Sequence, residues 1–335
     1  MRVAIDANIW IAERLLRSSM GAALLYAIKR KEGIILLPTT TKAEVVAGVV
    51  SEGQELVHQI QQALGVLQAL RGERPDIPLP SEEDFRSSVE SRLADLSPMI
   101  VHLQHTREHL DSALARVINK RPPAHRKEEF RDALFWEVAH SEALNTPVHI
   151  LARDAAFYEG NKFENGLSRE LTVECNASGA NVTIFDSVER FLNDLGQEAL
   201  QPDRQEVTGA LQGALAGHFQ KLASSSPFDL GSLRTAEVEA FVTEKHEQLA
   251  VRFSLEYDVR NLTTSSGVLP EATLVASGSA SFNFDEKMVS NVQVSSTDFF
   301  APDGFRVIGN RTIYASGSAV LGIRQVPYSV RRKLH

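Results

Sequence analysis

The chain has 335 residues, of which 43% are hydrophobic and 23% charged, and its formal net charge is −8. This is the composition of a soluble globular protein, and the length exceeds one ordinary domain, so we expect two. The acidic balance argues against tight, nonspecific binding to a nucleic-acid backbone.

Targeting signals and disulfides are not expected. No apolar run approaches the roughly 18 residues that span a bilayer, and strand-like sequence begins directly after Arg2, which leaves no room for a signal peptide. Cys175 is the only cysteine. A disulfide within the chain is therefore excluded, and a zinc–thiolate site is disfavoured. We expect a cytoplasmic protein.

The first part of the chain alternates apolar strands with helices. Residues 2–5 predict a strand covered on both faces, because they are apolar without alternation, and Asn8 is expected to cap the following helix. This alternation predicts a parallel sheet in an α/β/α sandwich over residues 1–195, with a helical insertion at about residues 54–120. Further strands are expected at 34–38, 148–151 and 182–185, and helices at 12–31, 42–70, 81–96, 99–119, 124–138 and 187–195.

The pattern changes in the last third of the chain. Residues 196–234 predict a helical linker with a helix at 205–222, and residues 235–335 predict a strand-rich, mainly antiparallel β domain. The alternation from Val251 to Tyr257 indicates a strand with one buried face. The segment 273–280 is repeated at 312–319, which predicts two related strands of one sheet. Strands are expected at 249–259, 272–284, 289–295 and 312–326.

Four acids of the first part occur in similar settings. Asp6 and Asp154 follow strands, Glu44 lies beside the second strand, and Asp132 lies early in a helix. Each alone is equally well explained as a turn or surface acid. Carboxylates that gather at one edge of a sheet repel one another and need cations. Oxygen ligands suit Mg²⁺ or Mn²⁺, which activate water for phosphodiester cleavage.

The order of these motifs resembles that of the PIN-domain nucleases, over about residues 1–195. The matching segments are Ile5-Asp6-Ala7-Asn8, Glu44 six residues after Pro38, Arg131-Asp132-Ala133-Leu134-Phe135-Trp136, and the run from Leu151 to Tyr158. The resemblance implies an endoribonuclease that uses Mg²⁺ or Mn²⁺ and leaves a 5′-phosphate and a 3′-hydroxyl. Asp6, Asp132 and Asp154 would bind the metal, Glu44 would bind metal or orient water, and Asn8 would support them.

The sequence also departs from the family pattern. Ala152 stands where the family usually has Thr or Ser, and Ala156 replaces a frequent second acid. The alternative is therefore a catalytically degenerate PIN-like module, whose unrecognised C-terminal domain recruits a partner. Weaker candidates for binding the RNA substrate are Arg126, Lys127, Arg131 and Arg153.

The biological role is open between a bacterial toxin, RNA processing and defence against phage. The resemblance is compatible with a homodimer, and in the nuclease reading the C-terminal domain would select substrate, bind a protein partner or mediate assembly. The histidines at 102, 105 and 109 recur at helical spacing and are interpreted as one face of a helix.

Overall fold

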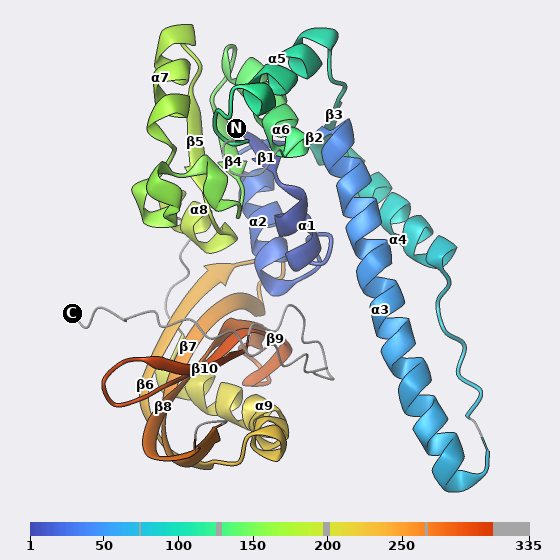
Figure 1. The fold of residues 1–335 in the computed structure, drawn as a ribbon, viewed down its shortest axis with the longest axis vertical. Coiled ribbons are helices and arrows are strands. Elements are labelled where there is room, and N and C mark those ends of the chain that lie inside the picture. The colour runs from blue at the N-terminus through green and yellow to red at the C-terminus, as the bar shows by residue number, and fades with distance from the viewer. Residues whose placement is uncertain (74, 125–128, 197–201, 265–266, 311–335) are drawn as a thin grey trace. The chain divides into compact units, whose positions relative to one another are not determined.

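The computed structural model describes residues 1–73, 75–124, 129–196, 202–264 and 267–310 (Figure 1). It contains two compact units. The first comprises residues 1–15 and 28–191, and the second comprises residues 16–27 and the chain from residue 192 onward. The domain boundaries expected from the sequence, at residues 195 and 234, remain predictions. In the described part of the chain, no helix is both long and apolar enough to cross a membrane.

The first unit is built on a parallel sheet, which confirms the predicted α/β fold. Its strand order is β3-β2-β1-β4-β5, and every neighbouring pair is parallel. The reversal of strand order beside β1 creates a topological switch point between β1 and β4. The strands are β1 (Arg2–Ile5), β2 (Ile34–Pro38), β3 (Ile100–Leu103), β4 (Val148–Leu151) and β5 (Val182–Phe185).

Helices cover both faces of this sheet, which explains why its strands are apolar without alternation. Trp136 of α6 and Leu171 of α7 pack with Ala4 and Ile150 on one face. On the other face, the ring of Phe191 in α8 lies 5.5 Å from that of His149 in β4. The helices of this unit are α1 (Ala7–Ala12), α3 (Thr39–Arg71), α4 (Glu82–Asp95), α5 (Arg107–Ile118), α6 (Phe130–Ala143), α7 (Arg169–Ser178) and most of α8 (Val188–Asp194), whereas most of α2 (Ser19–Arg30) belongs to the second unit.

Two helical predictions were wrong in detail. The helix expected at 12–31 is interrupted, because residues 14–16 have positive φ angles and separate α1 from α2. Asp6, and not Asn8, occupies the N-cap position of α1. The helix expected at 99–119 is split into β3 and α5, because β3 pairs with β2 as an edge strand. The three histidines therefore share no helix face: His102 lies in β3, and His109 takes part in the N-terminal cap of α5.

The second unit contains an antiparallel sheet in the order β10-β9-β8-β7-β6, which confirms the predicted β architecture. Sequence analysis missed β6 and β10, although in β6 the residues Ala236, Val238 and Ala240 alternate with Glu237 and Glu239. The elements are α9 (Arg204–Ser225), β6 (Asp229–Val242), β7 (Gln248–Thr264), β8 (Gly267–Asn283), β9 (Met288–Phe300) and β10 (Arg306–Asn310).

The core of this unit lies between α9 and one face of the sheet. Leu211, Leu215 and Phe219 of α9 belong to the same apolar cluster as Val251 and Phe253 of β7. Alternate residues from Val251 to Tyr257 are buried, as the sequence pattern predicted.

The small residues of β8 allow a close approach by the neighbouring strand. A Cβ atom added to Gly278 would lie 2.0 Å from the carbonyl oxygen of Gln293 in β9, at a point where the register shifts. Glycine in a strand commonly marks such a bulge. The second copy of the repeat, 312–319, and the strand expected at 312–326 lie outside the described residues.

Candidate functional site

The candidate site lies at the switch point of the parallel sheet. Ile5 of β1 and Leu151 of β4 are directly paired, so the two neighbouring strands end level with one another. Asp6 follows the first strand, and Asp154 follows the second after two further residues. Ligands of open α/β sheets bind outside the carboxyl ends of the strands at such a point.

Asp6 is held in place by the neighbouring strand β4 and by Asn8. Its main-chain N–H donates to the carbonyl of Leu151 at 2.9 Å, and its carboxylate accepts a hydrogen bond from Asn8 Nδ2 at 3.1 Å. Only 7% of the residue is exposed. Burial, together with the nearby charge of Glu44, raises the pKa of Asp6 to about 6. The structure thus places Asn8 beside Asp6, where it stabilises the ionised carboxylate.

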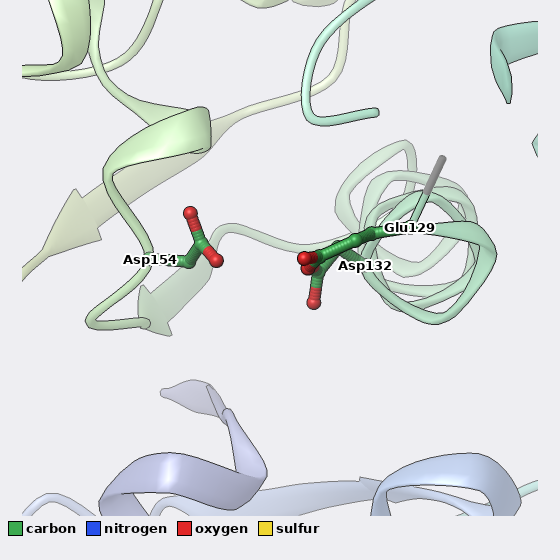
Figure 2. A group of neighbouring side chains, drawn as sticks. All are labelled: Glu129, Asp132 and Asp154. Carbon is green, nitrogen blue, oxygen red and sulfur yellow. The ribbon is translucent and has the colours of Figure 1, made fainter. Parts of the chain in front are cut away.

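Three other carboxylates form the tightest acidic group. Glu129, Asp132 and Asp154 each place one carboxylate oxygen within 4.8 Å of the others. Figure 2 shows Asp154 facing Glu129 and Asp132, which lie together at the start of α6. The Asp154 carboxylate also accepts a hydrogen bond from the N–H of Ala156 at 2.7 Å, which fixes its orientation. Residues from two separate segments therefore converge on one point.

The electrostatics of this group resist full ionisation. The pKa of Asp132 is raised by burial, by its hydrogen bond with Glu129, and by the charges of Asp154 and Asp6. Its Oδ2 atom is buried and has no hydrogen-bond partner among the described residues. A proton shared between close carboxyl groups relieves their repulsion when no cation does so.

Glu44 lies near this group but has a cationic partner. The carboxylate of Glu44, on α3, forms an ion pair of 3.0 Å with Arg131 of α6. Burial raises the pKa of Glu44, while Arg131 opposes that rise. Because Glu44 also raises the pKa of Asp6, the two carboxylates are electrostatically coupled.

The structure thus groups some of the sequence candidates more closely than others. Asp132 and Asp154 belong to the tight group, whereas Asp6 and Glu44 lie outside it and are linked to their neighbours by charge. Sequence reasoning missed Glu129, which it interpreted as part of a charged helix start. Its position three residues before Asp132 was the available signal, since residues at that spacing share a face at the start of a helix.

The positions of the basic candidates and of Ala152 say less about function than those of the acids. Arg153 is exposed, and Arg126 and Lys127 lie outside the described residues. Ala152 is fully buried, and its carbonyl accepts a hydrogen bond of 2.8 Å from the hydroxyl of Tyr158. The backbone at Ala152 is therefore tied down by a residue six positions later.

The donor set fits a hard divalent cation. It offers only carboxylate oxygens, which are the ligands that Mg²⁺ and Mn²⁺ prefer, and one of them is buried without a partner in the described part of the chain. A cation there would offset both the burial of charge and the repulsion between carboxylates, which together raise the pKa values of Asp6 and Asp132. The arrangement can therefore bind a metal ion beside a negatively charged ligand such as a phosphodiester.

Comparison with known proteins supports this assignment for the N-terminal region. A family model described as a PIN domain matches residues 3–157, which is just under half of the chain and includes all five acids discussed above. The resemblance seen in the sequence is thereby confirmed, and PIN domains are typically metal-dependent nucleases. No curated protein and no solved structure matches the chain, and its C-terminal domain is unrecognised.

Proposed function

We propose that the PIN domain at residues 3–157 is a metal-dependent endoribonuclease that hydrolyses RNA phosphodiester bonds. The observation that carries this proposal is the convergence of Glu129, Asp132 and Asp154 within 4.8 Å, at the carboxyl edge of the sheet. Carboxylates held this close together, with the raised pKa values of Asp132 and the neighbouring Asp6, are costly unless they serve a cation. The proposed ion is Mg²⁺ or Mn²⁺.

The side chains take separate roles in this proposal. Asp132 and Asp154, joined by Glu129, hold the ion, and Asp6 completes the set from the end of β1. Glu44 either binds the ion or accepts a proton from the attacking water. Asn8 keeps the carboxylate of Asp6 oriented through its hydrogen bond of 3.1 Å. Arg131 and Arg153 attract phosphate in this proposal, together with Arg126 and Lys127, because all four carry positive charge near the acids in the sequence.

The reaction is a hydrolysis by displacement at phosphorus. A bound divalent ion lowers the pKa of water and offsets charge on the phosphate oxygens. The water oxygen forms the new bond to phosphorus as the bond to the 3′ oxygen breaks. The departing oxygen takes up a proton, so the products carry a 5′-phosphate and a 3′-hydroxyl, as in the family. No side-chain nucleophile is required, in agreement with the absence of a Ser/His or Cys/His motif in the sequence.

The test is RNA cleavage by the purified full chain with Mn²⁺, with Mg²⁺ and with EDTA. Asp6→Asn and Asp154→Asn keep the side-chain volume and remove one charge, so cleavage should fall by several powers of ten. Asp111→Asn is the matched control, because Asp111 is 70% exposed on α5. Equal cleavage by wild type and Asp154→Asn, or cleavage that survives EDTA, would contradict the proposal.

The degenerate-module alternative makes a different prediction for the same experiment. Ala152 and Ala156 favour it, because both replace polar residues of the family pattern. If neither wild type nor variant cleaves a broad set of single-stranded and structured RNAs, the chain is better described as a binding module. Its C-terminal sheet would then recruit the partner.

A toxin or defence role would require that the proposed nuclease cleaves RNA inside a bacterial cell. Induced expression in bacteria should arrest growth if cellular RNA is the substrate, and Asp154→Asn should not. Growth arrest by both proteins alike would separate the toxicity from cleavage.

A further inference from the structure

The second half of α3 extends beyond the parts of the first unit that pack against it. Of its 33 residues, the buried ones are Thr41, Val45, Val50, Gly53 and Leu64. The α4 helix packs beside the earlier part, where the ring of Phe85 lies against Gly53 and would collide with any added Cβ atom. Past that point, Figure 1 shows α3 extending beyond the end of α4, with the chain that returns to α4 beside it.

This extension carries a regular apolar stripe. Leu56, Ile60, Ala63, Leu67 and Leu70 follow one another at intervals of four, three, four and three residues. We name these five residues the outer stripe. Such spacing keeps apolar side chains on one seam of a helix and is the pattern by which helices pair as coiled coils. The stripe is open to solvent: Leu56 is 45% exposed, Ile60 43%, Leu67 42% and Leu70 78%.

The absence of charged residues from this segment indicates that its partner surface is also uncharged. Residues 56–70 contain no Asp, Glu, Lys or Arg, although 23% of the chain is charged. An exposed helix normally carries charges on its solvent face, and adjacent exposed apolar residues usually mark an interaction site. Two copies of a chain with net charge −8 repel each other, so they can approach most closely at a segment free of charge.

The order of side chains in the segment is close to symmetric about Ala63. Leu56 and Leu70 lie seven residues to either side, and Ile60 and Val66 lie three residues to either side. In an antiparallel pair with a twofold axis at Ala63, Leu56 of each copy meets Leu70 of the other and Ile60 meets Val66, whereas Leu67 lies across from the aliphatic part of Gln59. The smallest side chain then lies where the two helices cross, which permits close packing. A twofold contact of this kind needs a self-complementary surface.

We propose that the outer stripe is a homodimer interface, in which α3 pairs antiparallel with α3 of a second copy about a twofold axis at Ala63. Residues 56–70 span about 22 Å of helix at 1.5 Å per residue, which is enough for several layers of contacts. The nuclease site forms from the other end of α3 and from other elements, so this inference does not depend on the proposed activity.

The first test measures the mass of the full chain in solution over a range of concentrations, by sedimentation or light scattering. Wild type should be a dimer, and Ile60→Glu with Leu67→Glu should be a monomer with unchanged helix content by circular dichroism. The control is Gln61→Glu with Gln68→Glu, which adds the same charge to the same helix on a side turned away from the outer stripe and should leave the dimer intact. A monomeric wild type, or a dimer unaffected by Ile60→Glu and Leu67→Glu, overturns the proposal.

The second test locates the axis. In Ala63→Cys, the two introduced thiols would face each other across the twofold axis, and mild oxidation should yield a covalent dimer. Gly65→Cys places its thiol on the opposite side of the helix and should yield none. The native Cys175 is buried and should not interfere. Equal cross-linking of both variants, or of Gly65→Cys alone, contradicts the antiparallel arrangement. Cross-linking by neither variant does so as well.

Discussion

The guanidinium of Arg131 lies 3.0 Å from the carboxylate of Glu44, and this pair joins the start of α6 to the start of α3 at the edge of the candidate metal site. The Arg131 side chain is 72% exposed and that of Glu44 23% exposed, so the pair spans the boundary between solvent and the acidic group. Arg131 is therefore the cation that partly neutralises this cluster in the metal-free protein.

Removing Arg131 should shift the pH dependence of cleavage. Burial raises the pKa of Glu44 and Arg131 opposes that rise, so Arg131→Gln should raise the pKa of Glu44 further. Because an ionised Glu44 is needed in the proposed mechanism, the acid limb of the pH–rate profile should move to higher pH. Arg153→Gln is the control, since it removes an exposed cation and should weaken RNA binding without moving that limb. Identical profiles for wild type and Arg131→Gln would remove Glu44 from the mechanism.

The metal-free protein should carry a stability penalty from Asp6 that grows with pH. The pKa of Asp6 is raised from 3.8 to about 6 in the folded state, so folding favours the protonated form. Stability is therefore lost as the pH rises from the unfolded to the folded pKa, and the penalty is constant above about 6. Relative to wild type, Asp6→Asn should gain up to about 3 kcal/mol between pH 4 and pH 7.

Chemical denaturation in EDTA at several pH values measures this gain. The comparison with Asp6→Asn cancels the contributions of surface acids, some of which titrate in the opposite sense. Adding Mn²⁺ should reverse the order of the two proteins at neutral pH, because the ion stabilises only a folded state that can bind it. Parallel pH curves for the two proteins in EDTA would show that Asp6 is not destabilised by burial.

Glu129 should contribute to metal affinity. One of its carboxylate oxygens lies within 4.8 Å of those of Asp132 and Asp154, and Glu129→Gln removes one of the three carboxyl groups. Mn²⁺ affinity, measured by calorimetry on the full chain, should fall on the order of tenfold or more. The exposed Glu108 at the start of α5 supplies the control variant Glu108→Gln. Unchanged affinity in Glu129→Gln would assign Glu129 to a purely structural role at the start of α6.

Arg116 should be a major contributor to the stability of the first unit. It is 5% exposed, pairs with Glu137 and Glu174, and donates to the carbonyl of Pro122 at 2.9 Å. Arg116→Met would remove the buried cation that two carboxylates share, leaving Glu174 with only Trp136 and the more exposed Arg121, and should cost about 3–5 kcal/mol of unfolding free energy. Arg121→Met is the control. Arg121 is 50% exposed and also approaches Glu174, yet its replacement should cost less than about 1 kcal/mol. A similar loss of unfolding free energy in both variants would show that the burial of the Arg116 ion pairs does not add to their contribution to stability.

The sequence by itself determined the elements that depend on local pattern. The strands at 2–5, 34–38, 148–151 and 182–185 are short apolar runs, and each lies in the parallel sheet at the predicted place. Asp6 and Asp154 follow two of these runs, so the order of residues alone was enough to predict a polar site at their common edge. The alternation from Val251 to Tyr257 likewise predicted a strand with one buried face. These features were readable because each is encoded within a few consecutive residues.

Only the tertiary structure decided the features that depend on contacts between distant parts of the chain. The edge strand β3 exists because β2 offers it hydrogen-bonding partners, while its own four residues fit a helix equally well by pattern. Glu129 joins Asp132 and Asp154 because the chain from 129 to 132 approaches the end of β4, which lies about twenty residues further along. Arg131 pairs with Glu44, 87 positions away. Such contacts join residues distant in sequence, and no local pattern records which of them the fold brings together.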